Sequence, residues 1–333
     1  MKKFFFILTF GLAITAYAQD VNKLIETAQL FIEKEDYANA KLVLNRAIQL
    51  KPDDYAIQQE LAYVDYLSGD IDDAIEVINK VLDDKDADEK SFQIAGMIYK
   101  AGNLLKDCER IFKRGLKKFP NSGVLHNELG EILLLQKMAS EAVKVWEDGI
   151  EKDPGYAGNY FHAAKYYHFT KSNPVLSILY GEIFINAESY TIRTAEMKSI
   201  LLESYKLFFA GIVTYDEKKS NPFQRAIAET LEKQRDVTTL GINTDILTMV
   251  RLRFVLDWFN QFSSKYPHKL FDQLRLLARD GLFEAYNQWI FGVATNVVQY
   301  QHWVNVNAKT NAEFSTFQKN RIFRMPAGQN YRY

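Results

Sequence analysis

Histidines, one cysteine and clustered carboxylates are the side chains of this 333-residue chain that could support catalysis or bind a metal. The five histidines are scattered: His126, His162, His168, His268 and His302. His162 and His168 are six residues apart, which places them on different parts of a helix surface and disfavours a shared metal. The sequence contains no zinc-protease, serine-hydrolase, phosphate-loop or dinucleotide-binding motif. We therefore expect no metal and no cofactor.

An acidic stretch around residue 86 is similar to a calcium-binding loop only in its charge. It contains Asp83, Asp84, Asp86, Asp88 and Glu89. Counted from Asp84, the sixth position is Glu89 where a calcium loop needs glycine, and the twelfth is Ala95 where it needs glutamate. A solvated turn is the better interpretation.

A catalytic site in the C-terminal third would have to use the acidic and basic groups available there. The candidates are Asp257, His268, Arg275 and Asp280. Their spacing does not require chemistry, because no nucleophile and base stand in a recognisable arrangement. An enzyme is therefore the least favoured of three functional hypotheses.

The elements that position these side chains follow a period of 34 residues. Small residues recur at Ala40, Ala74, Cys108 and Ala142, and others at Ala28, Ala62, Gly96 and Gly130. Large apolar residues recur at Leu44, Ile78, Phe112 and Trp146, and helix-ending positions at Pro52, Asp86, Pro120 and Pro154. Since Cys108 occupies a small-residue position and has no partner cysteine, we expect a buried structural thiol.

This pattern resembles the tetratricopeptide-repeat (TPR) family, whose 34-residue unit is a pair of antiparallel helices, A and B. The resemblance implies an all-α, right-handed solenoid of helical hairpins. We predict units at 21–54, 55–88, 89–122 and 123–156 and a degenerate fifth at 157–190, so that about five units fill residues 19–190. In the fifth unit Leu176 replaces the small residue and Glu188 the proline. Residues 191–213 are predicted to form a capping or connecting helix.

The resemblance also implies a concave groove, lined by the A helices, that binds a protein or peptide partner. The groove positions map to Gln59, Tyr63, Gln93, Met97, Lys100, Asn127, Glu131, Phe161, His162, Lys165 and His168, with Glu60 beside them. The family's carboxylate clamp uses paired Lys and Asn residues, but Gln59, Tyr63, Gln93 and Met97 stand at the corresponding places. A carboxylate clamp is therefore not expected.

Residues 214–333 lose the period and are predicted to form a helical, aromatic-rich C-terminal domain. A polar break ends at Pro222, and helices are predicted near 222–236, 244–265, 268–304 (broken near Gly281 or Gly292) and 310–323. The aromatic residues could form a core, a partner surface or a membrane contact. The apolar spacing 283, 286, 290, 293, 297 favours a core. Residues 285–304 carry no charge, but their amides argue against a membrane span.

The two ends of the chain predict its compartment and a possible docking segment. Lys2 and Lys3, an apolar run to Ile14 and the pattern Ala16-Tyr17-Ala18 are typical of a signal peptide over residues 1–18, cleaved before Gln19. We therefore expect export to the periplasm or outer-membrane association. The basic, aromatic tail from Gln318 to Tyr333 could be frayed, or could dock on the acidic half of the repeats or on a partner.

These features together predict a protein-binding scaffold. Residues 19–156 are net acidic and 157–333 net basic, but neither half carries the dense basic stripe of a nucleic-acid-binding protein. The leading hypothesis is a non-catalytic adaptor of the bacterial cell envelope, of the kind that serves as a subunit of an assembly or secretion complex. The alternatives are a periplasmic chaperone-like carrier of client segments and the enzyme considered above. Peripheral membrane association is compatible with the adaptor hypothesis.

Overall fold

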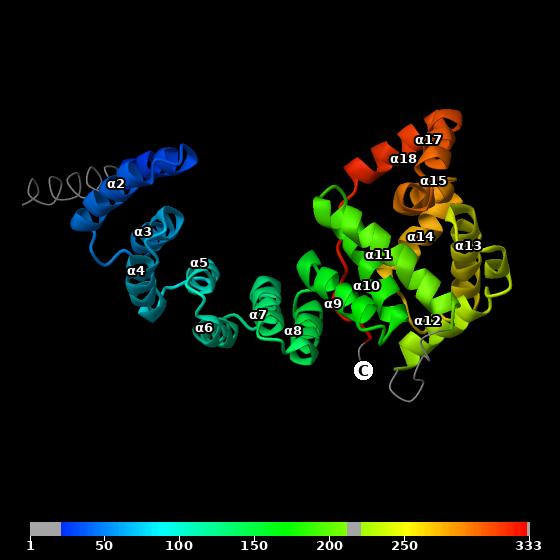
Figure 1. Cartoon of the computed structure of the whole chain (residues 1–333), viewed down its shortest axis with the longest axis horizontal. Helices are drawn as coiled ribbons and strands as arrows, with labels where there is room; N and C mark the ends of the chain where they lie inside the picture. The colour runs from blue at the N-terminus through cyan, green and yellow to red at the C-terminus, as the bar shows by residue number, and fades with distance from the viewer. Residues whose placement is uncertain (1–20, 212–220, 332–333) are drawn as a thin grey trace, which may run out of the picture. The chain divides into compact units, whose positions relative to one another are not determined.

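The computed structural model describes residues 21–211 and 221–331, and all regular secondary structure within these ranges is helical (Figure 1). The all-α prediction is therefore confirmed. The predicted signal peptide lies outside the described residues, and so does most of the polar break before Pro222. Within the described ranges, no helix has the length and apolar character needed to cross a membrane.

Pairs of helices follow the 34-residue period along the first part of the chain. Residues 21–33 are helical and precede α2 (Tyr37–Leu50). The following pairs are α3 (Tyr55–Ser68) with α4 (Ile71–Asp83), α5 (Glu89–Ala101) with α6 (Leu105–Lys118), α7 (Gly123–Leu135) with α8 (Ala139–Lys152), and α9 (Ala157–Phe169) with α10 (Pro174–Ala187). The single helix α11 (Ile192–Phe209) comes next. The predicted array of helical hairpins is present.

One residue with a positive φ angle lies between the two helices of each pair. These residues are Glu35, Gly69, Asn103, Lys137 and Lys171, with φ angles of 58°, 85°, 58°, 65° and 53°, and each follows the previous one by 34 positions. A left-handed residue reverses the chain direction sharply, and only glycine adopts it without side-chain strain. The left-handed turn is also present at Lys171. The backbone repeat therefore extends into the fifth pair, although Leu176 and Glu188 depart there from the side-chain pattern of the first four units.

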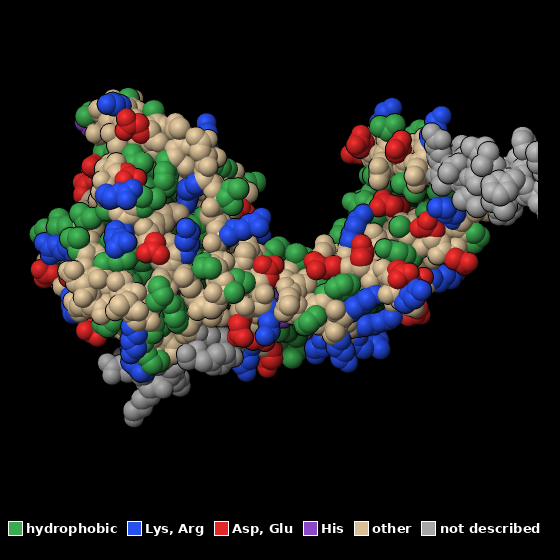
Figure 2. All heavy atoms as spheres, turned by 180° about the vertical axis from the view of Figure 1, so that it is seen from behind, with side chains coloured by type: hydrophobic (Ala, Val, Ile, Leu, Met, Phe, Trp, Pro, Cys, Tyr) green, Lys and Arg blue, Asp and Glu red, His purple; other side chains and the backbone are tan. Residues whose placement is uncertain are grey.

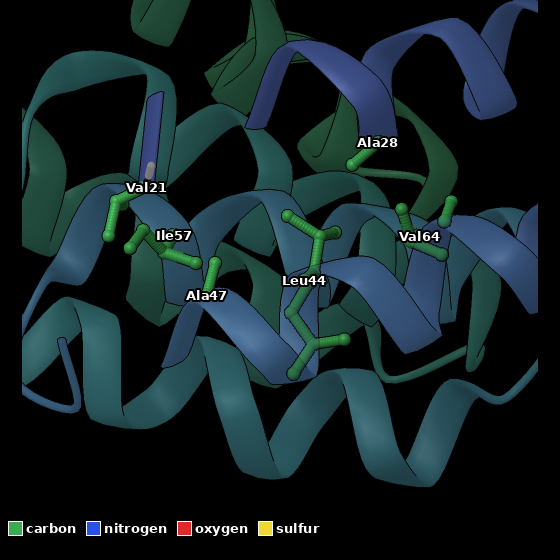
Figure 3. Packing of buried hydrophobic residues seen from close by; sticks show 8 residues of the cluster. Val21, Ala28, Leu44, Ala47, Ile57 and Val64 are labelled. Carbon is green, nitrogen blue, oxygen red and sulfur yellow. The ribbon is translucent and has the colours of Figure 1, made fainter. Parts of the chain in front are cut away.

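Small residues allow the helices of a pair to approach closely. Ala40, Ala74, Cys108 and Ala142 are fully buried. A Cβ atom on Gly96 would lie 2.0 Å from Cζ of Phe112, so this position has no room for a side chain. Cys108 is a buried thiol, as predicted, and donates a hydrogen bond to the Gly96 carbonyl at 3.3 Å. Figure 3 shows apolar packing between the first two repeats, with Leu44 from the first and Ile57 from the second.

The chain divides into two compact units: Met1–Pro120 with Glu131–Lys137, and Asn121–Gly130 with Met138–Tyr333. We refer to them as unit 1 and unit 2. The division falls within α7, whereas the sequence placed a domain boundary at residue 214. Helix α10 accounts for this difference, because nearly all its residues are buried and it contacts α9, α11 and the C-terminal helix α12 (Pro222–Glu232). The later hairpins and the C-terminal helices therefore share one core.

The remainder of unit 2 is a set of shorter helices. They are η1 (Val237–Leu240), α13 (Thr244–Gln261), α14 (Lys269–Arg279), α15 (Phe283–Asn287), the π-helix η2 (Gln288–Gly292), α16 (Val293–Thr295), α17 (Val297–Val306) and α18 (Ala308–Asn320). The helix predicted over 268–304 is broken at Gly281, whose φ angle is 73°, and again at Asn296, which is extended.

The apolar face predicted over residues 283–297 is present only in its first half. Phe283, Tyr286 and Ile290 are buried, but the side chains of Val293 and Val297 are 60% and 48% exposed. The π-helix η2 has a wider turn than an α-helix, and the chain starts a new helix after Asn296. Beyond residue 290, residues spaced 3.6 positions apart therefore no longer lie on one face of a single helix.

Aromatic side chains form the core beneath α13, in agreement with the favoured interpretation. Trp258 is fully buried. Its ring centroid lies 4.6 Å from that of Phe271 and 5.8 Å from those of Phe223 and Phe254. Such aromatic contacts add to the free energy of burying large apolar surfaces.

A buried ionic network joins α10 to the C-terminal helices. Arg251 of α13 forms an ion pair with Glu182 of α10, and both side chains are almost completely buried. Tyr286 donates a hydrogen bond to the Glu182 carboxylate at 2.9 Å and accepts one from Asn186 at 2.7 Å. Burial raises the pKa of the Glu182 carboxyl, and the adjacent Arg251 guanidinium opposes that shift.

The C-terminal tail packs against unit 2 as far as it is described. Phe323 and Met325 are buried. The Tyr331 ring lies 4.6 Å from that of Phe223, and its hydroxyl donates to the Pro267 carbonyl at 2.6 Å. The tail is therefore not frayed over its described residues, and these contacts are not with the acidic half of the repeats. They are with the C-terminal helices, and Arg321 adds a contact with α10, where it donates a hydrogen bond to Asn186 at 2.7 Å.

Candidate partner-binding surface

The A helices of unit 1 are held in place by side-chain caps at their N-termini. Asp54 accepts hydrogen bonds from Ala56 N at 3.1 Å and Ile57 N at 3.4 Å at the start of α3. Asp88 and Ser91 form a capping box at the start of α5. Both caps satisfy backbone N–H groups that the helix itself leaves unpaired. The acidic stretch around residue 86 thus forms the turn between α4 and α5, as predicted, and its Asp88 caps α5.

The predicted groove residues occupy equivalent repeat positions, and these positions differ in burial. One position contains Gln59, Gln93, Asn127 and Phe161, of which all but Gln93 are buried. Ser91 Oγ donates to Gln59 Oε1 at 2.6 Å, so this amide connects neighbouring A helices. Phe161 packs on Phe184 with a centroid distance of 4.9 Å. Gln59, Asn127 and Phe161 therefore face the interior, where a partner cannot reach them.

A second repeat position stays at the surface throughout. It contains Tyr63, Met97, Glu131 and Lys165. A third position, three residues further along each A helix, contains Tyr66, Lys100, Leu134 and His168 and is also accessible. Sequence reasoning missed Tyr66 and Leu134, although both lie 34 residues from a residue that it selected. We define the A-face surface as the six members that belong to unit 1: Tyr63, Tyr66, Met97, Lys100, Glu131 and Leu134.

The A-face surface combines aromatic, aliphatic and charged side chains. The rings of Tyr63 and Tyr66 stack with their centroids 6.2 Å apart. Met97 is 37% exposed and Leu134 46% exposed. Lys100 Nζ lies 3.3 Å from a Glu131 carboxylate oxygen. Partly exposed ion pairs contribute only ~0–1 kcal/mol, so a partner with its own charges could compete for this one.

The candidate residues of unit 2 are largely engaged in contacts within the unit. The His162 ring stacks on Trp146 with a centroid distance of 4.9 Å. Lys165 Nζ lies 2.6 Å from Glu196 and 4.9 Å from the Phe161 ring centroid. His168 Nδ1 lies 3.0 Å from Ser204 Oγ, and burial lowers the pKa of this imidazole. Because Ser204 has no exposed surface, this pair cannot act on a substrate.

The four C-terminal candidates for catalysis are not assembled into a site. Asp257 accepts a hydrogen bond from Gln234 at 2.9 Å, and Asp280 pairs with Arg279 at 2.8 Å. Arg275 lies over the Phe259 ring at 3.9 Å. His268 and Asp280 flank the two ends of the 11-residue helix α14, which at 1.5 Å per residue is roughly 16 Å long. These groups therefore have separate structural environments.

One group of carboxylates among the described residues has a geometry that could suit a metal ion. Oxygens of Asp65, Asp70 and Asp73 lie within 4.8 Å of one another. Lys41 Nζ lies 2.7 Å, 3.4 Å and 3.3 Å from these three carboxylates. The Lys41 ammonium already supplies the positive charge at this place. Its ion pairs connect the first repeat, which contains Lys41, to the second, which contains the three aspartates.

Comparison with known proteins supports the repeat fold. Residues 31–94 match the tetratricopeptide repeat family. PilF of Pseudomonas aeruginosa is similar in structure, with a TM-score of 0.50 and 14% identity over 58% of this chain and 86% of that protein. A thermophilic TPR protein of Thermus thermophilus, TTC0263, gives a TM-score of 0.44 and 13% identity, covering 55% of this chain and 99% of that one. No sequence match is found among curated proteins.

These similarities confirm the TPR hairpins that the 34-residue period predicted. At these identities the structural likeness concerns the fold alone. TPR arrays in general mediate protein–protein interactions, and scaffolds of this kind are typically non-catalytic. The partner and the compartment have to be inferred from this chain's own residues.

Proposed function

We propose that this chain is a non-catalytic adaptor of the bacterial cell envelope that binds a protein partner through the A-face surface. The observation that supports this most directly is the exposed Met97, which lies between aromatic and charged neighbours at a repeated surface position. Methionine adapts its shape to apolar partners, and tyrosine, as at Tyr63 and Tyr66, is one of the residue types enriched among the anchors that contribute most to binding at interfaces. The C-terminal helices supply a second contact surface in this proposal.

The partner segment that fits the A-face surface has apolar side chains flanked by charges of both signs. Met97 and Leu134 provide an apolar contact, and Lys100 and Glu131 provide one charge of each sign. Figure 2 shows that Lys and Arg side chains gather instead over α6, which is a B helix. The A-face surface therefore lies on the A helices α3, α5 and α7, whereas these basic side chains belong to a B helix.

A pair of substitutions tests the surface. Met97→Glu places a charge in the apolar part of the A-face surface, and we expect it to weaken partner binding at least tenfold. Leu42→Glu is the matched control, because Leu42 is 68% exposed and lies on the B helix α2. Partners are identified by in-cell crosslinking in the native host, followed by affinity purification. Equal binding by both variants would contradict the assignment of the surface.

The same experiment distinguishes the adaptor from a carrier of client segments. An adaptor yields one dominant partner at fixed stoichiometry, whereas a carrier yields many unrelated clients. The envelope location is supported by the signal-peptide pattern of residues 1–18. N-terminal sequencing of the protein recovered from fractionated cells should find Gln19 first, in the envelope fraction. A cytosolic protein that retains Met1 would refute the envelope location.

A further inference from the structure

A cavity of about 640 Å³ lies in unit 2 among the N-terminus of α13, the π-helix η2 and helix α17. This volume falls within the range of small-molecule sites, about 300–1,000 Å³. π-helical turns occur frequently at functional sites. The cavity is formed entirely by the C-terminal helices, so it is separate from the A-face surface.

Two asparagine side chains on the cavity wall have fixed orientations. Asn243 Oδ1 accepts a hydrogen bond from Ile246 N at 2.9 Å, which caps α13. Asn296 Oδ1 accepts from Val298 N at 3.1 Å and Gln299 N at 3.0 Å, which caps α17. Each cap uses the amide oxygen and leaves the NH₂ group available as a donor. The cavity therefore has preorganised donors whose direction is set by the helices.

Gln288 is, with Thr244, one of two buried polar side chains that line the cavity. It is 6% exposed and lines the space, yet its amide forms no hydrogen bond with any side chain or backbone group in the described ranges. Its amide atoms are not among the enclosed, unpaired polar atoms of the described residues, so the amide opens onto the cavity and can pair with a ligand there. Gly292 allows the Tyr300 ring to pack directly against the backbone of η2 beside Gln288, because a Cβ atom there would lie 2.4 Å from the Tyr300 ring and 2.9 Å from Gln288 Oε1.

The lining selects against anions and metal ions. It contains no Lys or Arg, so an anion would find no counter-charge, and Asp245 would repel it. One carboxylate and one imidazole, His302, are too few to form a typical metal site. What remains are amides, which both donate and accept, together with the rings of Tyr300 and Trp303.

We propose that this cavity binds a neutral saccharide. Each sugar hydroxyl both donates and accepts, which matches the amides of Asn243, Asn296 and Gln288. The apolar C–H face of a sugar ring can pack on the Tyr300 and Trp303 rings. The proposal goes beyond the adaptor function, because it gives the C-terminal helices a ligand of their own that is not a protein.

The test is titration of the intact chain with chitotetraose and with maltotetraose, followed by calorimetry and tryptophan fluorescence. We expect saturable binding of at least one of them with a dissociation constant in the range of about 1 mM or tighter. Gln288→Met is similar in volume, and Gln299→Ala truncates another amide side chain that lines the cavity; each should weaken binding at least fivefold. Gln301→Ala is the matched control, since Gln301 is exposed on α17 and does not line the cavity.

Failure of both saccharides to bind would overturn the proposal. Binding that none of the cavity variants weakens would also overturn it, because the ligand would then occupy another place. Saturable binding of tetra-alanine with the same dependence on Gln299 would reassign the cavity to peptides. Gln299→Ala keeps the test decisive even if Gln288→Met reduces folding, because the Gln299 side chain is exposed and makes no hydrogen bond to a described residue.

Discussion

His268 should make the stability of unit 2 depend on pH in a way that one substitution removes. Its ring is buried against Phe223 and Phe271, with centroid distances of 5.4 Å and 4.6 Å. Neither ring nitrogen has a hydrogen-bond partner among the described residues. Burial lowers the pKa of His268 from 6.5 to about 3. The folded state therefore keeps this imidazole neutral at pH values where the unfolded chain protonates it.

The sign and size of the effect follow from this shift. Because the unfolded state binds the proton more strongly, the free energy of unfolding decreases as the pH falls below 6.5 and stops decreasing near pH 3. Each pH unit in this window corresponds to about 1.4 kcal/mol. Between pH 7 and pH 5 the contribution of His268 should therefore change by about 2 kcal/mol.

The variant His268→Phe removes the titration and retains an aromatic ring. Urea unfolding followed by tryptophan fluorescence reports on unit 2, because all four tryptophans belong to it. The free energy of unfolding of the wild type, minus that of the variant, should fall by about 2 kcal/mol from pH 7 to pH 5. Phe184→Leu is the control, since Phe184 is buried and packs on Phe161 instead of His268, so the cavity should cost the same at both pH values. Parallel pH profiles for wild type and His268→Phe would refute the reasoning.

Three further predictions, made with four variants, test the packing. Glu182→Gln should destabilise unit 2 by about 3–5 kcal/mol, because Arg251 would stay buried without its counter-charge. The Glu182→Leu/Arg251→Leu double variant removes both charges and should recover most of this loss. Urea unfolding measures both changes. Deleting residues 326–333 should lower the melting temperature, because the Tyr331 contacts are lost; an unchanged value would mean that the docked tail contributes nothing. Gly96→Ala should cost about 1–3 kcal/mol in circular-dichroism unfolding, because Phe112 occupies the space of its Cβ.

The hairpin repeats could be predicted from the sequence because their determinants are local. The small residue at Gly96 and the ring at Phe112 are 16 positions apart and meet within one hairpin. The same pair of positions recurs every 34 residues, so each repeat provides an independent observation of the same packing. The left-handed turn at residues such as Lys171 recurs at the same period, but most of its residues are not glycine, so composition alone did not indicate it.

The candidate surface was only partly predictable, since burial on an A helix depends on the neighbouring helix. Gln59 and Tyr63 lie one turn apart and both belong to the face predicted to line the groove. The structure buries Gln59 through its hydrogen bond to Ser91 of the next A helix, and leaves Tyr63 accessible. The spacing within one helix does not determine how closely the next helix packs on it.

The sequence by itself determined the helical class, the 34-residue period and the hairpins, because each rests on contacts within one or two repeats. Only the tertiary structure decided how the C-terminal helices join the repeats. Glu182 and Arg251 are 69 residues apart and pair across two helices, and the docked tail brings Tyr331 to Phe223. Contacts of this kind depend on the three-dimensional arrangement of helices already formed, and no periodicity along the chain specifies them.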